Sequence, residues 1–367
     1  MSLRVLVVDD TVVFRRIVSD ALAGLPGVEV VGTASNGKLA LARMEGLRPD
    51  LVTLDIEMPE MNGIEVLEAM GRAGMKAGVI VLSSLTTRGG EMTVRALELG
   101  AFDFITKPDR GTAAENLASL RELLRPMIRA FERRRDIRAM LGREGAVLPP
   151  AEVPAAPPIS RGPEPPVLRR AFAGPPLVLI GVSTGGPAAL AAVLPALPAD
   201  LNAAVLIVQH MPAMFTRPLA ASLGRRSALR VTEAQDGEFA EANCVYLAPG
   251  GSQMKVAAGQ RGEVVLRITD DPPENGCKPA VDYLFRSVAL QFPGRSVAAI
   301  LTGMGNDGTA GLRLLKRGRC RSIAQDEASC VVFGMPKEAI AAGVIDTVAP
   351  LERIAATIVR SVREGYA

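Results

Sequence analysis

The sequence predicts an α/β protein with two doubly wound domains, and three observations lead to this prediction. Apolar runs of strand length alternate with helical patterns from residue 4 to residue 106, as in a parallel sheet covered by helices. The same alternation resumes at Leu177 and continues to residue 362. Between these regions, 10 of the 28 residues from Pro149 to Pro176 are proline, which can neither propagate a helix nor bury a core. We expect domains at residues 1–125 and 174–367, joined by residues 126–173.

The bulk composition agrees with this organisation. A chain of 367 residues is too long for one ordinary core, and 48% hydrophobic with 22% charged residues is typical of a globular protein. A net charge of +3 is too small to indicate a nucleic-acid partner. The four cysteines are widely scattered, and no apolar run is long enough to span a membrane. We expect a cytoplasmic monomer without direct membrane insertion.

In the first domain, five strands are expected to alternate with helices. The predicted helices include Val12–Ala23 and Gly37–Met44, and the predicted strands are Arg4–Val8, Val28–Thr33, Leu51–Leu54, Val79–Leu82 and Phe104–Thr106. In such sheets the ligand site lies beyond the carboxyl ends of the strands. Here those ends carry Asp9, Asp10, Asp55, Ser83 and Lys107.

These five residues suit a phosphoryl-transfer site. Carboxylates that converge on one point repel each other unless a cation is present, and oxygen ligands without histidine or cysteine favour Mg²⁺. A lysine and a hydroxyl opposite them suit a phosphoryl group on an aspartate. Each aspartate alone could instead be a helix cap or a turn former. Five such residues at one edge favour the site.

The motifs around these residues resemble the receiver domain of two-component response regulators, which has a flavodoxin-like fold. They are Val7–Asp10, Leu54–Gly63, Leu82–Ser84 and Phe104–Pro108, and the resemblance covers nearly all of residues 1–120. It implies that Asp55 accepts a phosphoryl group from a histidine kinase. It also implies that Mg²⁺ is held by Asp10, Asp55 and the backbone carbonyl of Glu57, with Asp9 in support. Ser83 and Lys107 would then sense the phosphate.

After the first domain, residues 117–141 contain periodic leucines and many arginines, including Arg133-Arg134-Arg135. This pattern predicts that the last helix of the domain continues as a solvated basic extension. A DNA-binding arm is the alternative interpretation, but no helix-turn-helix pattern follows it. We therefore expect no nucleic-acid partner.

The second domain is expected to have a mainly parallel sheet, with some of its strands in a hairpin. Helices are predicted from Pro187, at Leu219–Leu223, at Val281–Gln291, from Thr309, at Pro336–Ala342 and at Leu351–Val362. Strands are predicted at Leu177–Ile180, Ala203–Val208, Arg230–Glu233, Cys244–Ala248, Gln253–Ala257, Glu263–Ile268, Ser296–Leu301 and Ser322–Ala324.

A serine on a glycine-rich turn opens this domain. Ser183 follows the first strand within Gly181-Val182-Ser183-Thr184-Gly185, directly before a helix. Such a turn exposes the hydroxyl next to free backbone N–H groups, which is what an acyl-transfer nucleophile needs. The pattern alone is also typical of phosphate-binding turns and of turns without any function.

Two further residues favour the interpretation of Ser183 as a nucleophile. His210, the only histidine in the chain, and Asp307 each follow a predicted strand, so one crevice can hold both with Ser183. Histidine would take the serine proton and aspartate would orient the imidazole. Alone, His210 could be structural and Asp307 could cap the helix at Thr309. Their joint placement favours a Ser-His-Asp triad.

The order of these motifs and the residues in them resemble those of the chemotaxis protein-glutamate methylesterase family, CheB. Classical α/β-hydrolases run Ser, Asp, His, whereas this chain runs Ser, His, Asp. The matching segments are Ile180–Pro187, Val208–Pro212, Tyr246–Gly251 and Leu301–Gly308. A receiver that precedes such a domain is that family's own architecture.

This resemblance implies a hydrolase of glutamate γ-methyl esters on the cytoplasmic helices of methylated chemoreceptors, regulated by phosphorylation. It also implies deamidation of particular receptor glutamines. Ser183, His210 and Asp307 would be catalytic, the backbone N–H groups of Thr184 and Met304 would form the oxyanion hole, and this domain would need no cofactor. Two other classes stay open: a receiver-gated binding module, which methanol release would exclude, and a transcriptional regulator, which a DNA-binding assay would test.

Overall fold

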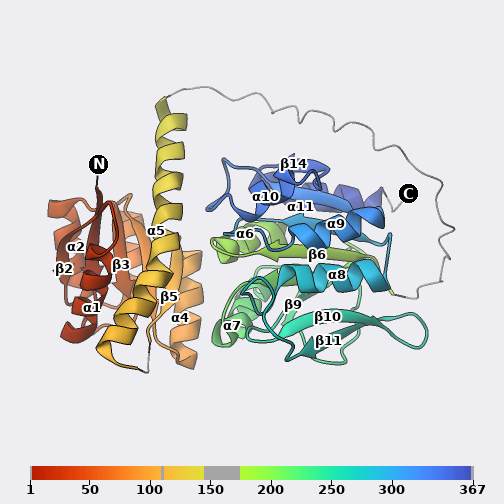
Figure 1. The fold of residues 1–367 in the computed structure, drawn as a ribbon, viewed down its shortest axis with the longest axis horizontal. Helices are drawn as coiled ribbons and strands as arrows, with labels where there is room; N and C mark the ends of the chain where they lie inside the picture. The colour runs from red at the N-terminus through yellow and green to blue at the C-terminus, as the bar shows by residue number, and fades with distance from the viewer. Residues whose placement is uncertain (1, 109–110, 144–173, 365–367) are drawn as a thin grey trace.

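The structure is a computed structural model that describes residues 2–108, 111–143 and 174–364. Figure 1 shows two α/β bodies side by side, one formed by the N-terminal half and one by the C-terminal half. The predicted α/β fold class is confirmed. Most of the proline-rich segment Pro149–Pro176 lies outside the described residues. Among the helices that are described, none is long and apolar enough to cross a membrane.

The N-terminal body is a five-stranded parallel sheet in the order β2-β1-β3-β4-β5. The strands of its centre are continuous apolar runs because helices cover both faces. The strands are β1 (Leu3–Val8), β2 (Val28–Ala34), β3 (Leu51–Asp55), β4 (Gly78–Ser83) and β5 (Asp103–Thr106). The helices are α1 (Val12–Ala23), α2 (Gly37–Leu47), α3 (Gly63–Arg72), α4 (Thr87–Glu98) and α5 (Ala113–Arg143).

Helix α5 is only partly the solvated extension that the sequence predicts. Leu120, Leu124 and Ile128 are buried in the core of the N-terminal body, at the spacing of one helix face. Phe131 packs edge-on against Phe102, with 5.4 Å between ring centroids. The helix then continues to Arg143 and projects beyond the body in Figure 1.

The C-terminal body is a seven-stranded parallel sheet in the order β14-β13-β12-β6-β7-β9-β8, with a separate antiparallel hairpin. The strands are β6 (Leu177–Val182), β7 (Ala204–Gln209), β8 (Arg230–Glu233), β9 (Cys244–Leu247), β12 (Ser296–Ile300), β13 (Arg321–Gln325) and β14 (Thr347–Ala349), and the hairpin is β10 (Gln253–Ala258) with β11 (Val264–Thr269). The helices are α6 (Gly186–Val193), α7 (Ala213–Gly224), α8 (Val281–Gln291), α9 (Thr309–Arg317), α10 (Met335–Ala341) and α11 (Leu351–Arg363), and a short 3₁₀ turn, η1, spans Leu194–Ala196.

Three details of this body differ from the predictions. Helix α6 begins at Gly186, one residue before Pro187, because Gly185 at φ 77° provides the left-handed turn that starts it. Strand β14 was not predicted, since three residues are too few to show a period. Helix α7 contains the predicted Leu219–Leu223 but begins six residues earlier, at Ala213, and the remaining predicted elements agree with the structure to within a few residues at their ends.

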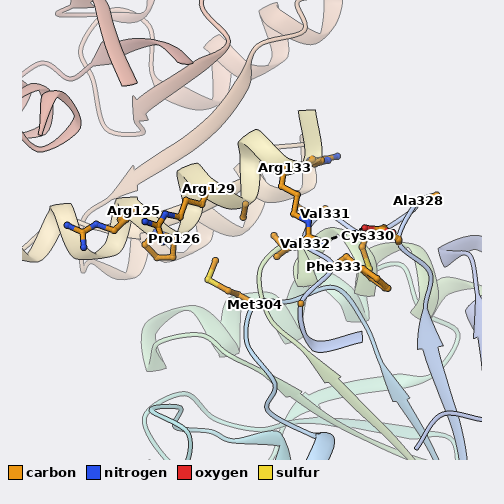
Figure 2. Close-up of a pocket in the computed structure, with 14 residues that line it drawn as sticks. Arg125, Pro126, Arg129, Arg133, Met304, Ala328, Cys330, Val331, Val332 and Phe333 are labelled. Carbon is orange, nitrogen blue, oxygen red and sulfur yellow. Dashed lines mark ion pairs between the residues drawn. The ribbon is translucent and has the colours of Figure 1, made fainter. Parts of the chain in front are cut away.

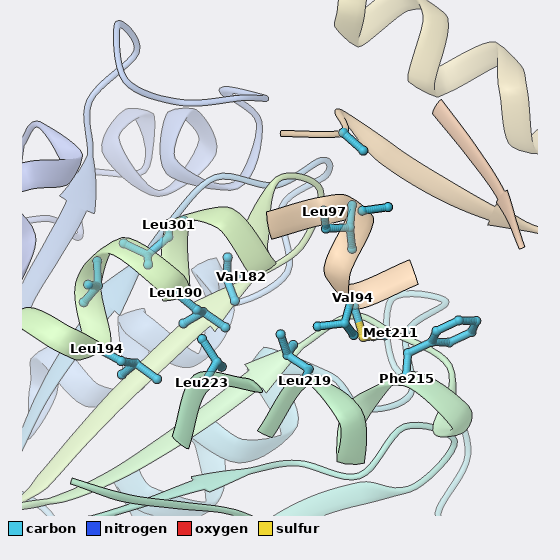
Figure 3. Close-up of a cluster of buried hydrophobic side chains, with 14 of the residues drawn as sticks. Val94, Leu97, Val182, Leu190, Leu194, Met211, Phe215, Leu219, Leu223 and Leu301 are labelled. Carbon is cyan, nitrogen blue, oxygen red and sulfur yellow. The ribbon is translucent and has the colours of Figure 1, made fainter. Parts of the chain in front are cut away.

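The two bodies contact each other through α4 and α7. Figure 3 shows Val94 and Leu97 of α4 beside Phe215 and Leu219 of α7, in one continuous cluster of buried side chains. At the edge of this contact, the Glu98 carboxylate accepts a hydrogen bond from the hydroxyl of Ser222. The N-terminal body is therefore packed directly against the C-terminal one, close to the carboxyl ends of its central strands.

Candidate active site

The carboxyl ends of three adjacent strands bring Ser183, His210 and Asp307 into one region. Ser183 follows β6, His210 follows β7, and Asp307 lies on the loop after β12. In the sheet, β6 lies between β7 and β12, so the chain runs outward from β6 in both directions. Ligand sites of open α/β sheets form at such a switch point. The topology thus places all three predicted residues at the same edge.

Backbone hydrogen bonds fix the turn that carries Ser183. The Ser183 N–H donates to the Thr302 carbonyl at 3.0 Å, and the Ser183 carbonyl accepts from the Gln209 side chain at 3.0 Å. Gly303 must be a glycine here, because a Cβ would lie 2.8 Å from the Ser183 Cβ and 2.4 Å from the Met335 sulfur. The loops after β6, β7 and β12 are therefore locked together around the serine.

Asp307 is a buried carboxylate with four hydrogen-bond donors. It accepts from the backbone N–H groups of Val281 (2.7 Å) and Asp282 (3.0 Å), from the Asn275 amide (3.1 Å) and from His210 Nε2 (2.8 Å). Burial favours the neutral acid, but the hydrogen bonds outweigh it and hold the pKa of Asp307 below its ordinary value. The carboxylate therefore stays ionised next to the imidazole.

The alternative role of Asp307, as the cap of the helix at Thr309, is wrong. Gly308 is the N-cap residue of α9, and the side chain that accepts from the first turn of that helix is Asp282, at 2.6 Å from the Gly311 N–H. The carboxylate instead accepts from the first N–H groups of α8, where the helix dipole also favours a negative charge.

His210 is held between Asp307 and a residue that the sequence did not point to. Its Nε2 lies 2.8 Å from Asp307, and its Nδ1 lies 3.6 Å from the sulfur of Cys277. Burial alone would lower the pKa of His210, but the hydrogen bonds to Asp307 and Cys277 raise it to about 9. In the neutral ring, the proton must be on Nε2 to donate to Asp307, so Nδ1 carries the free lone pair.

The nucleophile and the base are close but not hydrogen-bonded in this arrangement. Both Ser183 and His210 line one crevice, yet no hydrogen bond joins them in the part of the chain that the structure describes. The backbone N–H of Thr184, which lines the same crevice, and that of Met304, which follows Gly303 beside Ser183, donate to no atom of the described residues. Two free donors next to a serine hydroxyl are the elements of an oxyanion hole.

Sequence reasoning missed Asn275 and Cys277, which contact the triad directly. Asn275 and Gly276, at φ 54° and 72°, form a tight turn closed by two backbone hydrogen bonds between Glu274 and Cys277, of 3.0 and 2.8 Å. Asn-Gly between two short segments is a strong hairpin signal, so the turn could have been predicted. Its position beside His210 could not, because that contact spans 67 residues.

The predicted phosphoryl site also forms at one edge of the N-terminal sheet. Ligand oxygens of Asp9, Asp10 and Asp55 lie within 4.8 Å of one another, and the Lys107 ammonium lies 2.8 Å from Asp9 and 2.7 Å from Asp55. Burial raises the pKa of Asp55 to about 6 in spite of this lysine. An oxygen-only, crowded carboxylate set fits Mg²⁺ well.

Ser83 and Glu57 also lie at this edge of the N-terminal sheet. The buried Ser83 hydroxyl accepts a hydrogen bond from Thr93 of α4 at 2.6 Å, and among the described residues nothing links it to Asp55. The Glu57 N–H donates to the Asp55 carboxylate at 3.2 Å, so the backbone of Glu57 lies beside the carboxylate cluster. The structure thus brings four predicted residues together and leaves Ser83 engaged with a helix.

Both halves of the chain match known protein families. Residues 178–358 match the family described as CheB methylesterase, and residues 5–117 match the response regulator receiver domain. A protein of Desulfotalea psychrophila named protein-glutamate methylesterase/protein-glutamine glutaminase is 49% identical over 99% of both chains. The chain belongs to the CheB methylesterase family.

A second full-length relative and a solved domain structure are also similar to this chain. A protein-glutamate methylesterase/protein-glutamine glutaminase of Bacillus subtilis is 44% identical over 99% of both chains. A crystal structure of the Thermotoga maritima CheB methylesterase catalytic domain is 40% identical, covers 50% of this chain and 97% of its own, and has a TM-score of 0.49. The family model and the two full-length relatives confirm the predicted membership of this family.

In this CheB chain, the N-terminal body forms one wall of the candidate catalytic crevice. A cavity of about 240 Å³ is lined on one side by residues 103–106 of β5 with Leu123 and Met127 of α5, and on the other by Ser183, Thr184 and His210. Burial raises the pKa of Asp103 to about 6, although hydrogen bonds from Phe104 and Thr184 oppose it. The edge of the receiver sheet therefore faces the serine turn.

A second cleft lies where α5 crosses the loop that follows β13. It has a volume of about 390 Å³ and places Arg125, Arg129 and Arg133 of α5 opposite Met304 and Val332. Figure 2 shows these arginines on the helix and the loop residues below them. An ion pair between Arg133 and Glu327, at 3.9 Å, crosses this cleft. The helix thus passes beside the predicted oxyanion donor.

Proposed function

We propose that this CheB protein hydrolyses glutamate γ-methyl esters on methylated chemoreceptors and deamidates particular receptor glutamines, through a Ser183-His210-Asp307 triad. The observation that carries the proposal is the convergence of these three residues at adjacent strand ends, beside two unpaired backbone N–H groups. The names of the relatives supply the substrate. A substrate on the cytoplasmic part of a receptor would place the enzyme in the cytoplasm.

In the proposed mechanism, the Ser183 hydroxyl attacks the side-chain carbonyl carbon while His210 Nδ1 takes its proton. The N–H groups of Thr184 and Met304 stabilise the oxyanion. His210 then gives the proton to the leaving methanol or ammonia, and an acyl-serine remains. Water, deprotonated by the same nitrogen, releases the glutamate. Asp307 stays ionised and stabilises the imidazolium, so the catalytic domain needs no cofactor.

The receiver would control this reaction. We assign the phosphoryl group from a histidine kinase to Asp55, and Mg²⁺ to Asp9, Asp10, Asp55 and the backbone carbonyl of Glu57. The bound ion would neutralise charge on the transferring phosphoryl group. Lys107 is already in place beside Asp55. Ser83 would have to leave Thr93 of α4 in order to reach the phosphate.

The movement of Ser83 from Thr93 to the phosphate suggests how phosphorylation acts on the esterase. Helix α4 holds Ser83 through Thr93 and also carries Val94, Leu97 and Glu98, which pack against α7. Releasing Ser83 toward the phosphate would therefore change α4 at the interface. We propose that the unphosphorylated receiver covers the crevice with β5 and α5, and that phosphorylation favours its departure. Such couplings are typically ~1–3 kcal/mol.

We assign residues 1–125 to the receiver, 126–173 to the connection and 174–367 to the esterase, and we propose that the protein acts as a monomer.

The proposed function is tested by incubating the full-length protein with a methylated receptor signalling domain, with and without a small phosphodonor and Mg²⁺, and measuring the methanol released. We expect methanol release that phosphodonor increases ten- to hundredfold. Absence of methanol under both conditions would favour a binding module instead.

A further inference from the structure

We infer that the catalytic crevice contains a binding site for a borderline divalent cation such as Zn²⁺, formed by the Cys277 sulfur and His210 Nδ1, and that metal bound there blocks the enzyme. The binding itself rests only on the geometry of these residues. The inhibition rests in addition on the proposed role of His210 as the catalytic base.

The separation of the two ligand atoms suits a tetrahedral metal. Zn²⁺ binds a cysteine sulfur at ~2.3 Å and a histidine nitrogen at ~2.0 Å, and a tetrahedral angle then separates the two ligand atoms by roughly 3.5 Å. The Cys277 sulfur lies 3.6 Å from His210 Nδ1. An ion between them would therefore need almost no movement of either side chain.

Both ligands are held in place before any ion binds. Cys277 closes the Asn275-Gly276 turn through two backbone hydrogen bonds with Glu274, and its carbonyl also accepts from the Gln253 amide at 3.3 Å. Asn275 is in turn anchored to Asp307 at 3.1 Å. A metal site gains affinity when its ligands pay little conformational entropy on binding. This thiol is rigidly presented to the imidazole.

Asp307 completes the surroundings of the ion. It accepts from His210 Nε2, and a histidine ligand in metal sites usually donates its second ring nitrogen to a carboxylate in this way. The bond fixes the tautomer that leaves the Nδ1 lone pair free for the ion. One ligand atom from each of His210, Cys277 and Asp307 lies within 4.8 Å of the other two. His210 also lines the crevice that Ser183 lines, so further ligands such as water could reach the ion from there.

The donor types decide which ion this site selects. A thiolate and an imidazole favour Zn²⁺ over Mg²⁺, whereas the carboxylates of Asp9, Asp10 and Asp55 favour Mg²⁺. The two sites of the chain are thus chemically distinct. Binding at Cys277 releases the thiol proton, and the ion then occupies the lone pair with which His210 would accept the serine proton. Metal and catalysis compete for the same nitrogen.

The test uses the full-length protein without phosphodonor, and Co²⁺ and Zn²⁺ as the two probes. Co²⁺ bound to a thiolate gives a near-ultraviolet charge-transfer band that carboxylate sites cannot give. We expect this band, its loss when Zn²⁺ is added, and inhibition of methanol release over the same Zn²⁺ range. Cys277→Ser should remove the band and weaken Zn²⁺ inhibition by more than about tenfold. Because Cys277 also contacts His210, the Zn²⁺ inhibition of this variant is measured relative to its own metal-free rate.

Cys244→Ser is the matched control, since it removes a thiol of the same domain that lies next to Arg230 instead of His210. It should retain both the band and the inhibition. The inference is overturned if wild type gives no thiolate band, or if Cys277→Ser keeps the band while Cys244→Ser loses it. A band that depends on Cys277 in a protein that releases no methanol would support the metal site and contradict the proposed function alone.

Discussion

Glu98 provides a direct way to test whether the receiver holds the crevice closed. Its carboxylate belongs to α4 of the receiver but accepts hydrogen bonds from two side chains of the esterase domain, Ser222 of α7 and, at 3.3 Å, Arg226 just after that helix. The side chain is only 6% exposed, so these bonds are largely shielded from water. Glu98→Ala removes both bonds from the interface while it leaves every residue of the triad untouched.

The expected effect follows from the burial of the two partners. A hydrogen bond from a neutral hydroxyl to a buried carboxylate contributes ~1.5–3 kcal/mol. Arg226 is 45% exposed, so its ion pair adds less than about 1 kcal/mol. A total of about 2 kcal/mol corresponds to a roughly thirtyfold change in the ratio of closed to open molecules.

The assay is methanol release from methylated receptor domain by the unphosphorylated protein. Glu98→Ala should raise this basal rate roughly ten- to thirtyfold, and phosphodonor should then add little. Glu68→Ala is the matched control, because Glu68 pairs with Arg95 of α4 at 3.6 Å but lies within the receiver. An unchanged basal rate for Glu98→Ala, or an equal rise for both variants, would refute a closed state held by α4.

Four further predictions concern the triad and the receiver. With a chelator present, kcat/KM should rise with pH through about 9, since only neutral His210 is a base and its pKa is raised; a profile already flat above pH ~7 would contradict this. Because the pKa of His210 is raised in the folded state, protonation of its ring also stabilises the fold. This contribution to stability is complete below pH ~6.5 and is lost as the pH rises through about 9, and thermal unfolding measured across this range should detect the loss. Asp307→Asn should lower kcat by roughly 10⁴-fold, and a loss below tenfold would exclude its orienting role. Asp55→Ala should abolish the response to phosphodonor but keep the basal rate, whereas a retained response would place the phosphoryl group elsewhere.

Much of this fold was predictable because the strands of parallel sheets are unbroken apolar runs. Leu177–Val182 and Ala204–Gln209 are buried at every position, and the polar residues that directly follow them are the candidate functional ones. The burial of helices was less predictable. The sequence of α5 is typical of an exposed basic helix, although its Leu120 and Leu124 lie in the core. Its tertiary contacts, not its composition, decide which part is solvated.

The candidate site was predictable only where each residue follows its own strand. Ser183, His210 and Asp307 share that property, so topology alone brings them together. Cys277 and Asn275 lie on a turn that enters the crevice from a different part of the chain, and their contacts with His210 and Asp307 depend on how α8 is seated. The same holds for Asp103, whose place beside Thr184 depends on how the receiver docks. No local pattern records such contacts.

The most direct test of the proposed enzyme is methanol release by Ser183→Ala, measured with methylated receptor domain beside the wild-type protein. The triad predicts a loss of roughly 10³-fold or more, because the hydroxyl that forms the acyl-enzyme is gone. The fold should be unchanged, and the imidazole NMR signal of His210, the only histidine in the chain, should still report its titration. A variant that folds normally and keeps more than roughly a tenth of the wild-type rate would contradict Ser183 as the nucleophile.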